Sequence, residues 1–326
     1  MAELRWNPFL KDWTMVASNR QDRPQMPKDW CPFCPSSGNV PEYEVMEYDN
    51  DFPALLTAPD KPDPVGTDFF RVAPNYGKCE VILYSPEHRA RMTQLSDRHM
   101  EKLVHLWCSR FAALRADPKI KYVFIFENRG KAVGVTMPHP HGQIYAYPFL
   151  PKKMALETDS AKEYYEQNKR CLFCDFLQKE KEAKKRILFQ NRHFTVLLPF
   201  FSAYPYGVSI LSNIHRQYIT DFTPEERHTL GVTVRSTVGM LDSLFGFQFP
   251  YMMCMHSAPV NLGDYSKTFH FHIEFYPPMR SAEKLKYNAS SETGVWAACN
   301  PTCPENTAEE LRQAYRQYLT EKEKPK

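Results

Sequence analysis

An internal repeat constrains the fold of this chain more than any other feature. A Cys-x-x-Cys motif, a lone histidine and a His-x-His pair follow one another in this order twice along the 326 residues. The residues of the first copy and then of the second are Cys31, Cys34, His88, His139 and His141, followed by Cys171, Cys174, His215, His270 and His272. Self-similarity at this spacing indicates two copies of one folding unit of about 140 residues each.

The segments between these motifs predict the same elements in both copies. Residues 81–89 closely match residues 208–216. Each copy then continues into a helix-like run and returns through an apolar strand just before the paired histidines. We expect the helices at 97–114 and 224–244, and the strands at 122–126 and 251–255. The mixture predicts an α+β fold.

Residues 137–143 predict a reactive surface at the first His-x-His. Side chains alternate in a strand, so His139, His141 and Gln143 project to one side. Pro140 cannot donate to a sheet ladder, which favours an edge strand or the mouth of a site over a central strand. An isolated His-x-His is equally compatible with two polar surface histidines. The repeat favours a site.

The order of ligand types predicts a tetrahedral metal site in each half. Thiolates and imidazoles are the ligands that zinc prefers in closed four-coordinate sites. The two expected sets are Cys31, Cys34, His88 and His139, and Cys171, Cys174, His215 and His270.

Three other interpretations of the cysteines compete with zinc. A redox role would place a Cys-x-x-Cys at the start of a helix in a thioredoxin-like pattern, and we expect neither motif there. Disulfides fit poorly with an odd total of nine cysteines and with the lack of a secretory signal before Trp6. Degeneration of one site is the third interpretation, and it applies more to the second half.

Over nearly its full length the sequence resembles the galactose-1-phosphate uridylyltransferases, a branch of the histidine-triad superfamily with two fused histidine-triad-like halves. The stretches that carry the resemblance are 19–24, 50–52, 127–130, 139–143 and 275–281. The resemblance implies an antiparallel sheet in each half with helices packed on one face. Residues 1–165 would form the half with the nucleophile, and residues 166–326 a structural and substrate-contacting half. It also implies a homodimer.

The resemblance implies a ping-pong transfer of UMP. UDP-glucose would uridylylate His141, glucose 1-phosphate would leave, and a second hexose 1-phosphate, galactose 1-phosphate above all, would take the UMP. A phosphoramidate of this kind divides one difficult transfer into two easier ones. Gln143 would bind the non-bridging oxygens of the uridylyl group. The implied substrate contacts are Arg20, Arg23, Asn50, Asp51, Asn128, Thr136, Lys286 and Glu292.

The repeat argues separately about which half reacts. Glu274 takes the place of Gln143 at the same parity after the second pair of histidines. A carboxylate there would repel an attacked phosphate, so His272 is a poor candidate for a nucleophile.

The sequence departs from the family in two places. Ser291 and Ala298 stand where the family has a tyrosine and a glutamine, so uridylyl transfer is better supported than galactose as the acceptor. A related nucleotidyltransferase or phosphorylase using an adenylyl donor or another sugar 1-phosphate is the alternative.

The second departure concerns metals. Some family members bind a second metal, zinc or iron, through residues that match Glu157, His256, His270 and His272. His270 cannot easily serve this set and the cysteine set together. We favour the cysteine set, because the repeat predicts it and thiolates bind zinc tightly. Two zinc ions per chain are expected.

Composition excludes other function classes. The formal net charge of +3 gives no nucleic-acid footprint, which argues against a zinc-structured nucleic-acid module. Hydrophobic residues make up 43% of the chain, enough for a full core. No run of about 20 apolar residues suggests a membrane span. We expect a cytoplasmic enzyme.

Overall fold

The computed structural model describes residues 2–22 and 30–323. Its strands are β1 (Ala2–Asn7), β2 (Asp12–Ala17), β3 (Met46–Asp49), β4 (Val72–Pro74), β5 (Lys78–Leu83), β6 (Tyr122–Arg129), β7 (His141–Tyr147), β8 (Ile187–Gln190), β9 (Phe194–Leu197), β10 (Ser209–Ser212), β11 (Tyr251–His256) and β12 (His272–Tyr276). The α-helices are α1 (Asp97–Arg115), α2 (Lys152–Asn168), α3 (Leu172–Ala183), α4 (Pro224–Phe245), α5 (Ser290–Gly294) and α6 (Pro304–Glu323). Short 3-10 turns are η1 (Ser18–Asp22), η2 (Pro35–Ser37), η3 (Met92–Gln94), η4 (Lys131–Val133) and η5 (Ile219–Asp221). This content confirms the α+β prediction.

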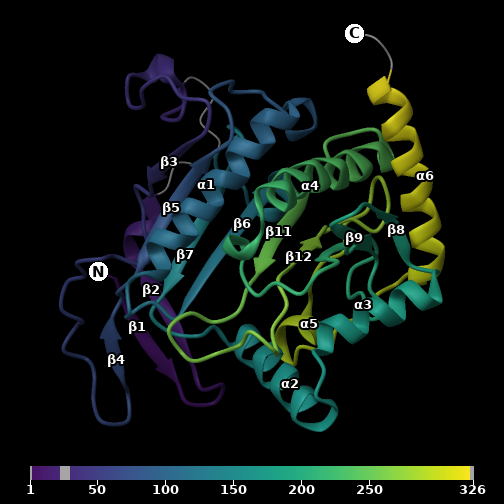
Figure 1. The fold of residues 1–326 in the computed structure, drawn as a ribbon. Helices are drawn as coiled ribbons and strands as arrows, with labels where there is room; N and C mark the ends of the chain where they lie inside the picture. The colour runs from purple at the N-terminus through teal and green to yellow at the C-terminus, as the bar shows by residue number, and fades with distance from the viewer. Residues whose placement is uncertain (1, 23–29, 324–326) are drawn as a thin grey trace.

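One antiparallel sheet of nine strands joins the two halves (Figure 1). Its order is β3-β5-β7-β6-β11-β12-β10-β9-β8, and the halves meet where β6 pairs with β11. We expected a sheet in each half, and the structure shows that the two sheets are continuous. An edge strand leaves a row of backbone groups unpaired, and pairing two such edges satisfies both.

The order β5-β7-β6 in the first half matches β10-β12-β11 in the second, as the repeat predicts. Strand β7 lies between β5 and β6, so the first of the two predicted settings, an edge strand, is wrong, whereas the second, the mouth of a site, agrees with a cavity lined by residues 138–141. Pro140 precedes β7, and its carbonyl accepts a hydrogen bond from the Tyr84 amide at 3.1 Å. The missing N–H of the proline therefore falls outside the ladder.

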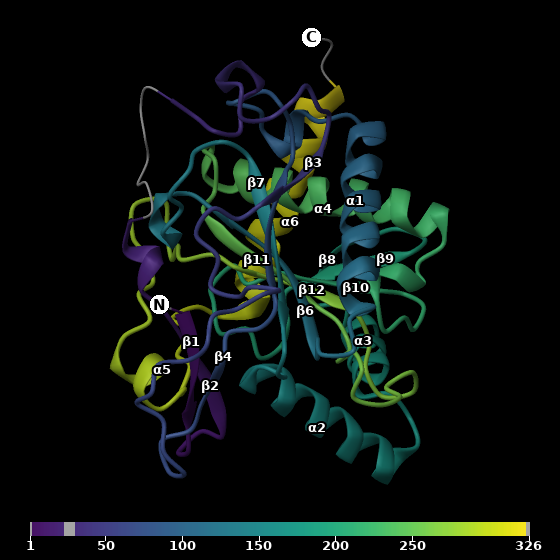
Figure 2. The same cartoon turned by 90° about the vertical axis from the view of Figure 1, so that its left-hand side faces the viewer.

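Helices α1, α4 and α6 cover one face of the large sheet, and most of the core lies beneath them. Ser96 caps α1 by accepting from the amide of His99, and Thr223 forms a capping box with Glu226 at the start of α4. Both helices agree with the predicted ranges to within one residue at each end. Figure 2 shows them on one side of the strands, with the small sheet β2-β1-β4 on the other side.

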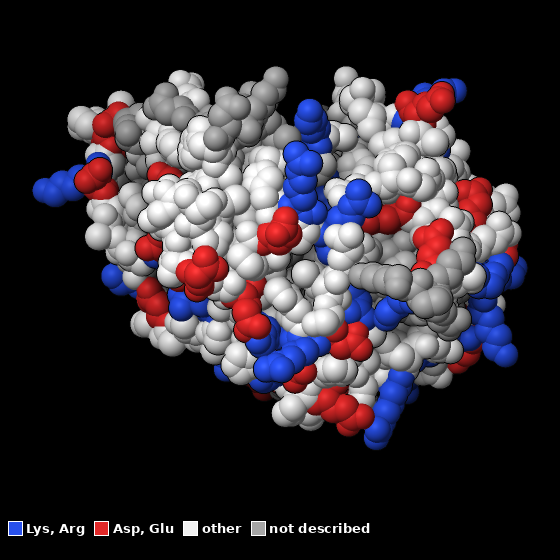
Figure 3. All heavy atoms as spheres, turned by 90° about the horizontal axis from the view of Figure 1, so that it is seen from above, with Lys and Arg blue, Asp and Glu red and all other residues white. Residues whose placement is uncertain are grey.

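The predicted division between residues 165 and 166 falls inside α2 and stays a prediction. Among the described residues, no helix has the length and apolar character needed to cross a membrane. In the view of Figure 3, acidic and basic side chains are intermingled over the surface.

Candidate active site and metal centres

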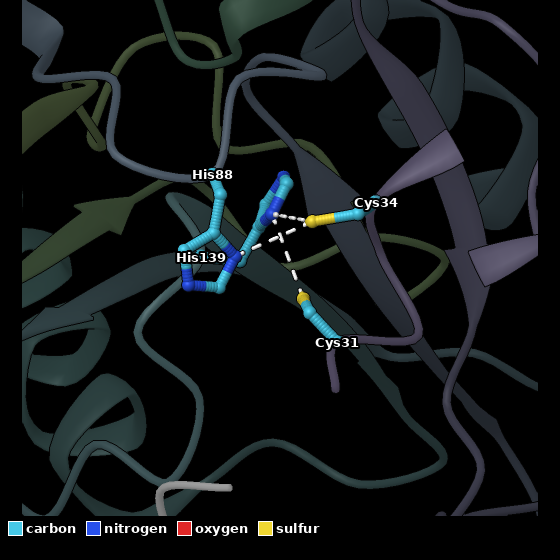
Figure 4. A group of neighbouring side chains, drawn as sticks. All are labelled: Cys31, Cys34, His88 and His139. Carbon is cyan, nitrogen blue, oxygen red and sulfur yellow. Dashed lines mark hydrogen bonds between the residues drawn. The ribbon is translucent and has the colours of Figure 1, made fainter. Parts of the chain in front are cut away.

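Four predicted ligands meet in the first half (Figure 4). The Sγ atoms of Cys31 and Cys34 each lie 3.6 Å from Nδ1 of His139, and Cys34 Sγ lies 3.3 Å from Nδ1 of His88. Two ligands of one tetrahedral zinc ion are roughly 3.5 Å apart, given Zn–S and Zn–N bonds of about 2.3 and 2.0 Å. The four side chains therefore fit one zinc ion.

The protonation state of His139 suits this role. Its Nε2–H donates to the carbonyl of Ser85 at 2.7 Å, which places the lone pair on Nδ1 beside the two thiols. Burial lowers the pKa of His139 to about 4, so the ring is neutral at physiological pH.

The second half brings together an equivalent set. The Sγ atom of Cys174 lies 3.3 Å from Nδ1 of His215 and 3.4 Å from Nδ1 of His270, and Cys171 belongs to the same group. His270 donates from Nε2 to the hydroxyl of Ser212 at 2.7 Å. Ser212 is the counterpart of Ser85 in the repeat. It orients the ring with a side-chain oxygen where the first half uses a carbonyl.

The second cysteine motif also shows a difference from expectation. Cys171 is the N-cap of α3 and Cys174 lies in its first turn, so this motif does begin a helix, although we predicted that neither motif would do so within a thioredoxin-like pattern. The element before α3 is helix α2, however, and the thioredoxin-like strand is absent from that place. The local helix does not make the pair a redox motif, because both thiols face imidazoles.

A third group of potential ligands lies on the face of the sheet opposite α1, α4 and α6, where helix α2 contributes Glu157. It consists of Glu157, His256, His272 and Glu274, whose ligand atoms all lie within 4.8 Å of one another. The alternative assignment put His270 in this set, but the structure places His270 with the cysteines, as we favoured, and Glu274 takes the fourth position here. Because strand neighbours alternate faces, His272 and Glu274 share one side while His270 precedes the strand and turns to the cysteines. The two sets therefore do not compete for a ligand.

The third group has strong internal electrostatics. His256 Nδ1 lies 3.0 Å from Glu157 Oε2, and His256 Nε2 lies 3.6 Å from Glu274 Oε2. Burial alone would raise the pKa of Glu157, but His256, His272 and Lys153 lower it to about 2. Both carboxylates are thus available as anionic ligands. Imidazole and carboxylate together suit zinc, iron or manganese.

His141 is the first residue of β7 and is partly exposed. Its Nδ1–H donates to the carbonyl of His139 at 2.7 Å, which places the lone pair on Nε2. The next residue is Gly142, where a Cβ would overlap the hydroxyl of Tyr84. Glycine lets the strand pass over this buried tyrosine and keeps His141 at the end of the cavity.

Gln143 lies two residues further along the same face. Its Oε1 accepts from the hydroxyl of Tyr145 at 3.3 Å, so the NH₂ end of the amide is the one that can donate to a phosphate oxygen. Arg20 donates from Nη1 to the same hydroxyl at 3.2 Å and to the carbonyl of Phe52 at 3.0 Å. The structure thus brings Arg20 to the face that carries His141. Arg23 lies outside the described residues.

The sequence did not single out Phe33, which links three parts of the site. Its ring centroid lies 5.9 Å from that of His139, 5.6 Å from that of His141 and 5.4 Å from that of Tyr48. The Tyr48 hydroxyl in turn donates to the carboxylate of Asp51 at 3.0 Å. The only sequence signal was the place of Phe33 inside a Cys-x-x-Cys motif. Asn50, next to Asp51, accepts from the amide of Phe52 at 2.9 Å.

A cavity of about 220 Å³ adjoins His139 and His141. Asn128 of β6 lines it, and so do Arg129 and Lys131. Thr136 lies in the loop that forms another wall, between Val135 and Met137.

Lys286 and Glu292 lie elsewhere in the chain. They pair at 2.9 Å and line a cleft of about 310 Å³ together with Arg280 and Tyr287. This cleft shares no lining residue with the cavity beside His141. Within one chain these two predicted contacts therefore line a different cleft from the one beside the nucleophile.

Known proteins match both halves of this arrangement. The profile of the galactose-1-phosphate uridyl transferase N-terminal domain matches residues 1–151, and that of the C-terminal domain matches residues 157–289. Galactose-1-phosphate uridylyltransferase of Thermotoga maritima is 39% identical over 96% of this chain and 98% of its own length. The Rattus norvegicus protein of the same name is 32% identical over 95% of this chain and 86% of its own.

Solved structures agree with the sequence relatives. A structure described as uridylyltransferase matches with a TM-score of 0.89 at 30% identity, over 97% of this chain and 99% of its own. An ADP-glucose phosphorylase from Arabidopsis thaliana with bound ADP-glucose shares the fold, with a TM-score of 0.74 at 21% identity, over 96% of this chain and 99% of its own. On the combined evidence of site, sequence and fold, the chain belongs to the galactose-1-phosphate uridylyltransferase family.

Proposed function

We propose that this protein transfers UMP from UDP-glucose to a hexose 1-phosphate through a uridylyl group on His141. The observation that carries the proposal is the orientation of His141, whose Nδ1–H is held by the His139 carbonyl at 2.7 Å. That hydrogen bond leaves Nε2 as the nucleophilic nitrogen and stabilises the ring when it carries charge. Membership of the family supports the choice of substrates.

The reaction divides into two displacements at one phosphorus. Nε2 of His141 forms a bond to the α-phosphorus, and the bond from that phosphorus to the bridging oxygen breaks, so glucose 1-phosphate leaves with the electron pair. A phosphate oxygen of the second hexose 1-phosphate then attacks the same phosphorus, and the bond to Nε2 breaks. Galactose 1-phosphate is the acceptor that the family favours.

The other predicted residues position the substrate, since phosphoryl transfer depends mainly on placement and charge stabilisation. The NH₂ group of Gln143 and the guanidinium of Arg20 donate hydrogen bonds to the phosphate oxygens. Asn50 and Asp51 bind the nucleoside, and Asp51 is linked to Phe33 through Tyr48. The remaining proposed contacts to the phosphates and the sugar are Arg23, Asn128 and Thr136.

The metal sets have different tasks in this proposal. Zinc at Cys31, Cys34, His88 and His139 fixes His139, two residues before the nucleophile, and zinc at Cys171, Cys174, His215 and His270 fixes the second half. Iron or zinc is the proposed ion for Glu157, His256, His272 and Glu274. No metal takes part in either displacement. We also propose that the chain divides functionally into residues 1–165, which carry the nucleophile, and residues 166–326, which are structural and contact substrate.

We place the enzyme in the cytoplasm as a homodimer. Lys286 and Glu292 line a different cleft from the one beside His141 in the same chain. The second copy would therefore supply them for the hexose phosphate.

Intact-mass measurement after incubation with a donor tests the reaction. UDP-glucose should add the mass of UMP to the protein, and galactose 1-phosphate should remove it. ADP-glucose and adenylyl sulfate, offered in parallel, should give little adduct. An AMP adduct in place of the UMP adduct would replace this proposal by adenylyl transfer. Offering other sugar 1-phosphates to the uridylylated protein identifies the acceptor.

Mixing two inactive variants tests the dimer. His141→Asn lacks the nucleophile and Glu292→Ala lacks the sugar contact. If sites are shared between copies, co-refolded mixed dimers contain one site with both residues intact and regain part of the activity. Mixtures that stay as inactive as the separate variants would refute the sharing of sites.

A further inference from the structure

A positively charged side chain lies beside the four potential ligands of the third group. Lys153, in the first turn of α2, directs Nζ to Oε2 of Glu274 at 2.8 Å and to Oε1 of Glu157 at 3.5 Å. It also contacts the hydroxyl of Tyr276, over whose ring Nζ lies at 4.9 Å from the centroid. A single lysine therefore contacts both carboxylates of a potential metal site.

Lys153 and the expected metal share the carboxylate of Glu274. Glu274 Oε2 faces Lys153 on one side and His256 Nε2, 3.6 Å away, on the other. A divalent ion held by His256 and Glu274 would lie within a few ångströms of the ammonium group, and the two positive charges would repel each other.

The charges and exposures of these groups show how the conflict is resolved. The two carboxylates are 20% and 19% exposed, so both need a cationic partner. The Lys153 side chain is 57% exposed, so it can swing into water without losing a buried position. Lys153 can neutralise the two carboxylates when no metal is bound, and it can move into solvent when a metal binds.

We propose that Lys153 is a built-in cation that occupies the charge position of the metal at Glu157, His256, His272 and Glu274, and that a divalent ion must displace it to bind. The site thus has a state in which lysine neutralises the carboxylates and a state in which metal does. Fold and nucleotide transfer then persist without metal there. The inference rests on the third group's being a metal site and is independent of the chemistry at His141.

Manganese is a selective probe, because carboxylate and imidazole ligands accept Mn²⁺ whereas thiolate sites favour zinc. The full-length protein, with zinc at the two cysteine sets only, is titrated with Mn²⁺, and free Mn²⁺ is followed by electron paramagnetic resonance. Lys153→Met keeps the length of the side chain and removes its charge. We expect it to bind Mn²⁺ about tenfold more tightly than the wild type, a gain moderated by the exposure of the lysine.

Three variants control the measurement. Lys153→Arg keeps the charge and should bind as the wild type does, and so should Lys152→Met, a neighbouring charge removal. His256→Asn should abolish the tight binding, which locates the ion. Unchanged affinity in Lys153→Met, or binding that survives in His256→Asn, would overturn the proposal.

Thermal unfolding gives a second readout. Without Mn²⁺, Lys153→Met should unfold at a lower temperature than the wild type, since two carboxylates lose their cation, and Mn²⁺ should restore the loss. A loss that Mn²⁺ does not restore would show that Lys153 has only a packing role. The UMP adduct at His141 should be the same in both proteins, so failure here is distinguishable from failure of the proposed reaction.

Discussion

The two pairs of histidines lie on equivalent strands but in opposite chemical surroundings. In the first half His141 shares its face with Gln143, a neutral amide that can donate. In the second half His272 shares its face with Glu274, an anion that can only accept. Both rings make the same backbone hydrogen bond: Nδ1–H donates to the carbonyl two residues earlier, at 2.7 Å for His141 and 2.9 Å for His272.

The neighbouring strands complete the contrast. Asn128 of β6 lines the same cavity as His141, and His256 of β11 pairs directly with His272. Neutral donors around one histidine suit an attack on phosphate, whereas lone pairs around the other suit a cation. One scaffold thus provides a nucleophile or a metal ligand according to two neighbouring side chains.

Replacing the two histidines separately should give the largest contrast. His141→Asn should abolish the UMP adduct, because no other nitrogen occupies the place of Nε2. His272→Asn should form the adduct at the wild-type rate. Intact mass after UDP-glucose measures both. An unchanged adduct on His141→Asn would mean that the wrong half has been assigned the chemistry.

Exchanging the neighbouring side chains should have a smaller but still large effect. Gln143→Glu introduces the carboxylate of the second half beside the phosphate and should slow adduct formation by about 100-fold or more. Glu274→Gln should leave that rate unchanged and weaken metal binding at the third group. Rapid-quench measurement of adduct formation decides the first point. A Gln143→Glu variant that reacts as fast as the wild type would remove the proposed role of Gln143.

Loss of one cysteine from each half should sharpen the comparison further. Cys31→Ser and Cys171→Ser should each reduce the zinc content by one ion and lower thermal stability, because structural zinc stabilises the fold around it. Only Cys31→Ser should also slow the transfer, since its site holds His139, two residues before the nucleophile. Elemental analysis and the adduct rate measure these effects. Zinc near one ion per chain, unchanged in Cys171→Ser, would show that the second cysteine pair holds no metal.

Local patterns in the sequence predicted the repeating elements well. Ser96 caps the start of α1, and Thr223 caps the start of α4. N-cap residues of this kind can be recognised in a sequence. The pairing of β6 with β11 was not predicted, because it depends on how two folded halves meet and not on any one strand.

The sites show the same limit. Both Cys₂His₂ groups follow from the repeat, and the structure brings each together. The sequence also placed Glu274 opposite Gln143 in the repeat. It could not show that Glu274 replaces His270 beside Glu157, because that requires the direction in which the chain enters β12. Phe33 and Tyr145 act through ring and hydroxyl contacts that carry no sequence motif.

Glu127 gives the smallest effect, and it lies on β6, next to the strand that carries His141. Its Oε1 accepts from the buried Tyr251 at 3.1 Å, and burial raises the pKa of Glu127 to about 7 although Arg129 and Tyr251 oppose the shift. Its counterpart by strand register is Met255, which is buried and uncharged. A raised pKa stabilises the fold below the ordinary value of 4.5, and this contribution is lost as pH rises through 7. The loss is at most about 3 kcal/mol.

Relative to Glu127→Gln, the wild type should therefore lose stability to denaturant between pH 5 and pH 8, whereas Met255→Leu should follow the wild-type pH dependence. A Glu127→Gln variant with that same dependence would show that Glu127 ionises freely, and that the two halves do not differ at this position.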